Sequence, residues 1–284
     1  MPRIGLVTDS TCDLGPEELA ALDVRMVPLT VHLGDEHFAD WLDLRPDEFY
    51  PMLLAASQLP TTSQPSPADF SAVYERLAAE GCEEIVVATL SAALSGTFES
   101  ATLAASTSPV PVRIVDGKRA SQATGLIVKA AAEARAAGMG ASAIEARTIE
   151  VARSTRLYFL LDTLDYLVKG GRAGKATGLA ASLLNIKPVL QVNAEGIIEP
   201  FKKVRGRSQA IAALAQHVAD DSRRNGRMRI ALLHAAKAED AEELEAAIRA
   251  AGADVEIESH GVIGAVIGVY TGPGAVGVAY YPIG

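Results

Sequence analysis

Short apolar runs alternate with longer amphipathic segments through the first half of the chain. Buried strands are predicted for three runs rich in branched side chains and bounded by turn residues, at 3–8, 84–90 and 112–116. Helices are predicted for the alanine-rich segments 122–137 and 141–153, and from Ser66 onward, where one helix face carries Phe70, Val73, Tyr74 and Leu77. Strands that alternate with helices are typical of a parallel sheet covered by helices on both faces.

Two further segments complete the first half. Residues 24–33 predict a second strand, and Pro28 within it indicates an edge position or a bulge. Residues 45–57 predict a helix that leads into a proline-rich loop at 60–67.

The pattern changes near Ser154, where paired strands with helices between them replace the regular alternation. We predict strands at 157–161, 188–192, 197–204 and 229–235, helices at 176–184, 208–222 and 238–251, and terminal strands from Val255. No Asp, Glu, Lys or Arg follows Glu258, but repeated glycines favour paired strands and turns over a membrane-spanning helix. The fold class is therefore α/β with two domains, a parallel-sheet α/β domain at 1–155 and a smaller α+β domain at 156–284.

Composition supports this reading and indicates a cytoplasmic protein. Aromatic residues make up only 5% of the 284 residues, as is typical of α/β proteins built from aliphatic strands and alanine-rich helices. The two cysteines, Cys12 and Cys82, fit reduced thiols better than a disulfide framework, and the first residues lack the apolar stretch of a secretory signal. The net charge of −9 argues against a broad nucleic-acid interface.

The charge is unevenly distributed. Residues 169–207 contain eight basic and two acidic residues, a net charge of +6, which leaves −15 for the rest of the chain. A basic segment in an acidic protein indicates an anion site or a docking face for an anionic partner. A solvated charged surface is the alternative for most of its lysines.

Hydroxyl side chains gather in two turns. In PTTSQPSP at 60–67, three prolines restrict the backbone around Thr61, Thr62 and Ser63, so these donors can be held ready for a ligand. Ser66 has the capping-box spacing to Asp69, so it is expected to begin the next helix while Thr62 and Ser63 remain free. The second turn, at 91–97, follows a strand and carries Ser91, Ser95 and Thr97. Only the fold can bring the two turns together.

Three short patterns resemble known functional motifs but lack the surrounding residues that those motifs require. GPGAVG at 272–277 has the letters of a dinucleotide fingerprint, but the chain ends before the required helix and acid, so it predicts a glycine turn. Gly174 and Lys175 lack the other residues of a phosphate-binding P-loop. His32, Asp35 and His37 are close in sequence, but no second cluster supports a metal site, so a surface turn is expected.

The sequence also contains no pattern that indicates catalysis. Ser95 in ALSGT lacks the glycine of a nucleophile elbow, and none of the five histidines is an evident base for it. Hydroxyls, arginines and abundant aliphatic surface suit a protein that holds an amphipathic anion, with no metal and no cofactor other than that ligand.

Taken together, the motifs resemble the DegV family of bacterial fatty-acid-binding proteins. They occur in family order over nearly the whole chain: TDSTCDL at 8–14, PTTSQPSPADF at 60–70, LSGTF at 94–98, DTLDYLVKGGRAGK at 162–175, NIKPVL at 185–190 and GPGAVG at 272–277. Each motif is weak alone, but the ordered set is specific.

The resemblance implies a non-enzymatic carrier of one long-chain fatty acid, with the acyl chain buried and the carboxylate held between the two domains. It also implies a partner, a separate ATP-dependent fatty-acid kinase similar to dihydroxyacetone kinases, which makes an acyl phosphate for phospholipid synthesis. By the same resemblance the head-group contacts fall on Thr62 or Ser63, on Ser95, and on Arg172 and Arg205.

One position departs from the family pattern. Family members often carry histidine just before the T-G-P-G turn, where this sequence has Tyr270. A phenol still donates a hydrogen bond to a head group, but it does not titrate near neutrality as an imidazole does. Two other functions remain open from the residues alone: an acyl hydrolase or transferase that uses Ser95, and a regulatory module that senses lipid.

Overall fold

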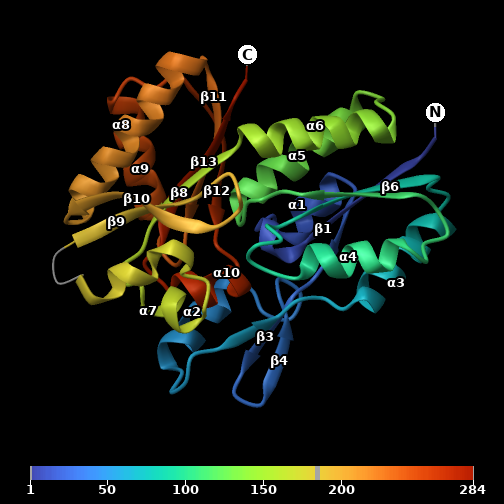
Figure 1. Cartoon of the computed structure of the whole chain (residues 1–284), viewed down its shortest axis with the longest axis horizontal. Coiled ribbons are helices and arrows are strands. Elements are labelled where there is room, and N and C mark those ends of the chain that lie inside the picture. The colour runs from blue at the N-terminus through green and yellow to red at the C-terminus, as the bar shows by residue number, and fades with distance from the viewer. Residues whose placement is uncertain (1, 183–185, 284) are drawn as a thin grey trace.

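The computed structural model describes residues 2–182 and 186–283 (Figure 1). Its first sheet is parallel, in the order β2-β1-β6-β7, and comprises β1 (Ile4–Asp9), β2 (Val24–Val27), β6 (Glu84–Thr89) and β7 (Val112–Asp116). Helices α3 (Pro67–Ala79) and α4 (Thr97–Ala105) pack on one face, and α5 (Gln122–Ala136) and α6 (Ala141–Ser154) on the other. Helix α1 (Pro16–Ala21) packs beside β2. The predicted α/β class is confirmed.

The second sheet is built from six strands of the second half, in the order β10-β9-β8-β13-β11-β12. These are β8 (Arg156–Leu160), β9 (Ile186–Val192), β10 (Ile198–Arg205), β11 (Met228–His234), β12 (Val255–Val262) and β13 (Val276–Pro282). All neighbours are antiparallel except β11 and β12, which are parallel. Helices α8 (Arg207–Asn225) and α9 (Ala238–Ala250) cover one face of this sheet.

Helix α5 lies between the two sheets (Figure 1). It packs on β1 and β6 of the first sheet and on β11 and β13 of the second, and twelve of its fifteen residues are buried. Gly125 allows the segment after β1 to approach α5 closely, because an added Cβ at Gly125 would lie 2.9 Å from the carbonyl oxygen of Cys12. The two halves of the chain therefore share a continuous core. The boundary at 155/156 stays a prediction.

A small antiparallel sheet, β4-β3-β5, lies at one end of the molecule and corrects two predictions. It contains β3 (Thr30–Leu33), β4 (Glu36–Ala39) and β5 (Thr61–Ser63), and α2 (Pro46–Ala55) follows β4 in the chain. The predicted single strand at 24–33 is wrong: Pro28 separates β2 from β3, which belong to different sheets. Residues 61–63, predicted as loop, pair with β3.

The C-terminal segment contains a helix where we predicted only strands and turns. Helix α10 (Ala265–Thr271) begins after Gly264 and is buried on most of its surface. A helix surrounded by protein has no polar face, so its sequence, AVIGVYT, shows no helical periodicity and reads as a strand. The first four residues of the GPGAVG segment, 272–275, form the predicted turn between α10 and β13, and the last two begin β13.

Two shorter helices lie near α10. Helix α7 (Asp165–Lys169) contacts it directly, as does α2. The predicted helix at 176–184 is a 3-10 helix, η2 (Gly174–Ser182), and residues 183 and 184 lie outside the described residues. Within the described ranges, no helix combines the length and the apolar character needed to cross a membrane.

Candidate ligand-binding site

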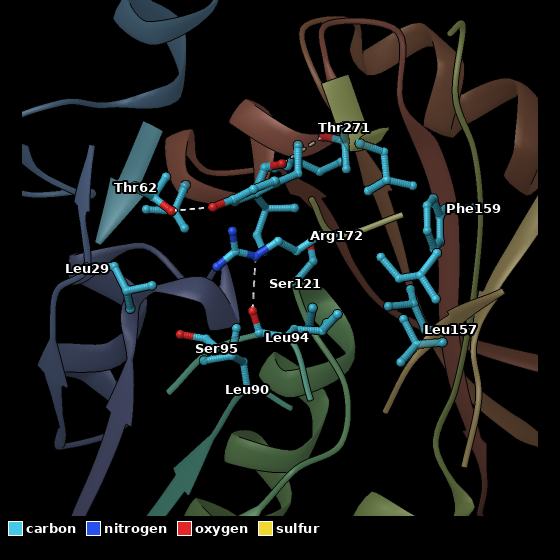
Figure 2. Close-up of a pocket in the computed structure, with 18 of the residues that line it drawn as sticks. Leu29, Thr62, Leu90, Leu94, Ser95, Ser121, Leu157, Phe159, Arg172 and Thr271 are labelled. Atoms are coloured by element: carbon cyan, nitrogen blue, oxygen red, sulfur yellow. Dashed lines mark hydrogen bonds between the residues drawn. The ribbon is translucent and has the colours of Figure 1, made fainter. Parts of the chain in front are cut away.

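A cavity of about 270 Å³ lies where the two sheets, the small sheet and α10 meet. Figure 2 shows Thr62, Ser95 and Arg172 at one side of it and Leu157 and Phe159 at the other. Most of the lining is aliphatic or aromatic: Leu29, Leu90, Leu94, Leu157, Phe159, Leu167, Val192, Ile198, Leu233, Ile263, Val266 and Ile267. Such a lining, with Thr62, Ser95 and Arg172 grouped at one side, suits a ligand with a long apolar part and one polar end.

Thr62 and Tyr270 meet at the polar side. The Thr62 Oγ1 and the Tyr270 phenol oxygen are 2.6 Å apart, so they share a hydrogen bond. Thr62 is fixed because β5 pairs with β3, opposite Val31. The helix that follows begins as predicted, since Ser66 Oγ accepts from the Asp69 backbone N–H and the Asp69 carboxylate accepts from the Ser66 backbone N–H.

Ser63 borders the same cavity, but its hydroxyl lies elsewhere. Ser63 Oγ is 3.0 Å from His32 Nε2, on the exposed part of the small sheet. Successive side chains of a strand point to opposite faces, so Thr62 and Ser63 do not act as a pair. His32 and His37 face each other across the β3–β4 hairpin, 2.7 Å apart through their Nδ1 atoms, and the described residues contain no group of three metal-ligating side chains.

Arg172 supplies a positive charge to the polar side. It follows α7 after Gly171, whose φ of +72° favours glycine. Its Nε donates to the Leu94 carbonyl at 3.3 Å and its Nη1 to the Gly170 carbonyl at 3.0 Å. Its guanidinium carbon lies 5.1 Å from the centre of the Tyr270 ring, a cation–π contact. No described acidic residue forms an ion pair with Arg172, so its charge is available to a ligand.

Ser95 precedes α4 and lines the cavity. Its hydroxyl lies 2.9 Å from the Thr97 hydroxyl, and either oxygen can donate. Among the described residues that line the cavity there is no histidine and no carboxylate. Ser95 therefore has a hydroxyl neighbour in place of a base, an arrangement suited to hydrogen bonding with a ligand.

The structure does not bring Arg205 to this cavity. Arg205 is the last residue of β10, opposite Ile186, and its side chain is exposed. Other charges of the basic segment are paired: Lys175 Nζ lies 3.0 Å from Glu199, and Arg207 bridges Asp162 and Asp240. The local charge is thus lower than the sequence count indicates, and Arg172 is the arginine that reaches the cavity.

Three buried residues that sequence reasoning did not select organise the cavity wall. Ser121 lines the cavity with a φ of 54°, unusual for serine, and its Oγ lies 2.5 Å from Asp13 Oδ2. Asp13 Oδ1 accepts from the Gly264 backbone N–H at 2.9 Å, and Asp40 Oδ1 accepts from that of Val266 at 3.4 Å. The two carboxyls thus hold the beginning of α10, which contributes Val266 and Tyr270 to the cavity.

Burial changes the acidity of both carboxyls. Desolvation raises the pKa of Asp40 to about 7 and raises the pKa of Asp13 well above its usual range. Asp9, in the same stretch of sequence as Asp13, caps the 3-10 helix η1 (Ser10–Cys12). No local signal distinguishes Asp40, because its partner lies 226 residues away.

Comparison with known proteins gives the family. Residues 3–283 match the family model described as "Uncharacterised protein, DegV family". A DegV domain-containing protein of Deinococcus radiodurans is 40% identical over 99% of both chains. The chain belongs to the DegV family.

Solved structures of DegV proteins have the same fold. The match described as "Fatty Acid Binding of a DegV family Protein from Thermus thermophilus" has a TM-score of 0.92 and 37% identity, and covers 99% of this chain and all of that one. The match described as "Crystal Structure of DegV, a fatty acid binding protein from Bacillus subtilis" has a TM-score of 0.90 and 31% identity over the whole of both chains. The family expected from the ordered motifs is confirmed.

Proposed function

We propose that this DegV protein binds one long-chain fatty acid in the cavity between the sheets. The acyl chain occupies the part lined by Leu157, Phe159 and Leu233, and the carboxylate lies at the polar side near Thr62 and Arg172. The observation that carries the proposal is this pairing of an aliphatic cavity with an arginine that has no acidic partner among the described residues. Fatty-acid binding by similar DegV proteins supports it.

The head-group contacts divide by chemistry. Arg172 donates charge-assisted hydrogen bonds to the carboxylate, while Thr62, Ser95 and Tyr270 donate neutral ones through their hydroxyls. Each of these four side chains lines the cavity. Ser63 and Arg205 do not belong to this set, because the Ser63 hydroxyl meets His32 and Arg205 lies away from the cavity.

Energetics favour a lipid over a small polar acid. Burial of about fifteen methylene groups at ~0.8 kcal/mol each contributes roughly 12 kcal/mol before costs. Association and ordering remove several kcal/mol or more of this sum, which still leaves tight binding. The head-group contacts then determine orientation and register more than affinity.

The proposed role is that of a non-catalytic, cytoplasmic carrier that presents the carboxyl group to a separate ATP-dependent fatty-acid kinase. Two observations support a carrier over a hydrolase that uses Ser95: a hydroxyl lies beside Ser95 where a base would be needed, and Arg172 is exposed enough for a partner to reach the head group. No other cofactor is required by this role.

Native mass spectrometry of the protein purified from cells tests the binding step. We expect a bound mass that denaturation releases as a fatty acid, identified in the extracted lipid. A protein that is empty on purification and takes up neither palmitate nor oleate would exclude fatty-acid binding. For the carrier role, the loaded protein is mixed with a fatty-acid kinase and ATP, and we expect acyl phosphate to form only when both proteins are present.

A further inference from the structure

A second cavity, of about 240 Å³, adjoins the first. It lies between α7, α10 and the segment 59–62, which includes the first two residues of β5. Thr62, Arg172 and Tyr270 line both cavities, and the Thr62–Tyr270 hydrogen bond is part of the wall that the two cavities share. The second cavity is nearly as large as the first, so a site for an acyl chain alone leaves it unexplained.

The charge of the second cavity differs from that of the first. Lys169 and Arg172 both line it, and no acidic residue is among its described lining residues. Lys169 forms no ion pair or hydrogen bond with any described residue, in contrast to Lys175 and Arg207, which are paired with acids. The second cavity therefore holds two positive charges without a counter-charge from the described residues.

Arg172 is oriented so that it can serve both cavities. Its Nε and Nη1 atoms donate to the carbonyls of Leu94 and Gly170, while Nη2 has no hydrogen bond to the described part of the chain. The Tyr270 ring beneath the guanidinium limits its rotation. Thr61 and Tyr166, which also line the second cavity, add hydroxyl groups that can donate to an anion.

We propose that the second cavity binds a phosphate group, either free or carried by a lipid. An arginine and a lysine together are a typical phosphate-binding pair. Their two positive charges match a phosphate group better than a carboxylate, because a phosphate carries about −1.5 to −2 at neutral pH. A carboxylate would neutralise one of these charges only. The phosphate site rests on the cavity and its cations and does not require that the first cavity bind a fatty acid.

The test uses Lys169, which lines the second cavity and not the first. Binding of inorganic phosphate is measured by calorimetry at low ionic strength for the wild type, for Lys169→Gln and for Lys203→Gln. Lys203 is a matched control because it is exposed on β10 and lines neither cavity. We expect Lys169→Gln to bind phosphate about tenfold more weakly, and Lys203→Gln to bind as the wild type does.

A second arm identifies the source of the phosphate. Monododecyl phosphate and dodecanoate carry the same alkyl chain, so a phosphate carried by a lipid predicts a preference for the former that Lys169→Gln abolishes. If Lys169→Gln weakens the binding of inorganic phosphate but not that of monododecyl phosphate, the result supports free phosphate as the ligand. If neither phosphate probe responds to Lys169→Gln more than to Lys203→Gln, the proposal is wrong. Palmitate binding is measured in parallel: its absence would count against the proposed function and leave the phosphate site standing.

Discussion

The Thr62 hydroxyl and the Tyr270 phenol lie 2.6 Å apart although 208 residues separate them in the chain. Thr62 belongs to β5 of the small sheet. Tyr270 belongs to α10, which connects β12 to β13 of the six-stranded sheet. Their hydrogen bond thus joins the first and second halves of the chain at the polar side of the cavity. The Tyr270 phenol therefore has a defined partner at the edge of the cavity.

A double-mutant cycle with Thr62→Val and Tyr270→Phe is expected to show coupling. Because the two hydroxyls bond to each other, the combined loss in unfolding free energy should be smaller than the sum of the single losses, by about 1 kcal/mol. The measurement is urea unfolding of the ligand-free protein. Thr61→Val is the control for the same strand, because Thr61 is exposed, and its cycle with Tyr270→Phe should be additive.

Arg172→Ala is expected to weaken palmitate binding about tenfold or more, because a charge-assisted contact to the carboxylate is lost. The melting temperature should change little, since Arg172 is exposed on a turn and bonds only backbone carbonyls. Fluorescence displacement and thermal unfolding give the two quantities. Arg205→Ala, a matched loss of one exposed charge away from the cavity, should leave both unchanged. Equal effects of the two substitutions would show that only net charge matters.

Ser95→Ala is expected to weaken palmitate binding by a few-fold, as befits one neutral hydrogen bond. It should not alter the hydrolysis of a p-nitrophenyl acyl ester, because Ser95 lies beside Thr97 and no base lines the cavity among the described residues. Ester turnover by the wild type that disappears in Ser95→Ala would instead identify Ser95 as a nucleophile.

Because the pKa of Asp40 is raised, we expect the free energy of unfolding to depend on pH. Its pKa is about 7 in the folded protein, against 3.8 for an ordinary aspartate, so the folded state retains a proton that the unfolded state releases between these values. The stabilisation from Asp40 is fully present below about pH 4 and is lost as the pH rises to about 7.

The comparison with Asp40→Asn isolates this contribution. Between pH 7 and pH 5 the wild type should gain on the order of 2 kcal/mol in unfolding free energy relative to Asp40→Asn, since each pH unit is worth about 1.4 kcal/mol. Asp13, whose pKa is also raised by burial, contributes in the same direction to both proteins. Parallel pH profiles for the two proteins would contradict the prediction.

Local sequence was sufficient to predict the elements whose structure is determined by neighbouring residues. Residues 112–116 form the predicted strand without change, and Ser66 begins α3 through the predicted capping box. Thr62 and Ser95 were selected as hydroxyls in turns, and the fold brings both to one cavity, which no local rule could establish.

Local sequence was not sufficient where the structure depends on contacts between distant parts of the chain. Helix α10 is encoded by apolar residues without periodicity, and its helical form depends on burial between α2, α7 and the cavity. Residues 61–63 become a strand only because β3 offers an edge to pair with. Arg205 and Arg172 looked alike as cations of one basic segment, and only the path of β10 separates them.

Strand β13 lies between β8 and β11, and α10 precedes it directly. On a ribosome, β8 and β11 emerge well before the strand that joins them, so the six-stranded sheet exists as two unconnected parts until β13 has emerged. The cavity wall formed by α10 is made at the same stage, because α10 directly precedes β13. A nascent or truncated chain that lacks α10 and β13 therefore lacks this cavity, and a ligand of the cavity can stabilise only chains that contain both elements.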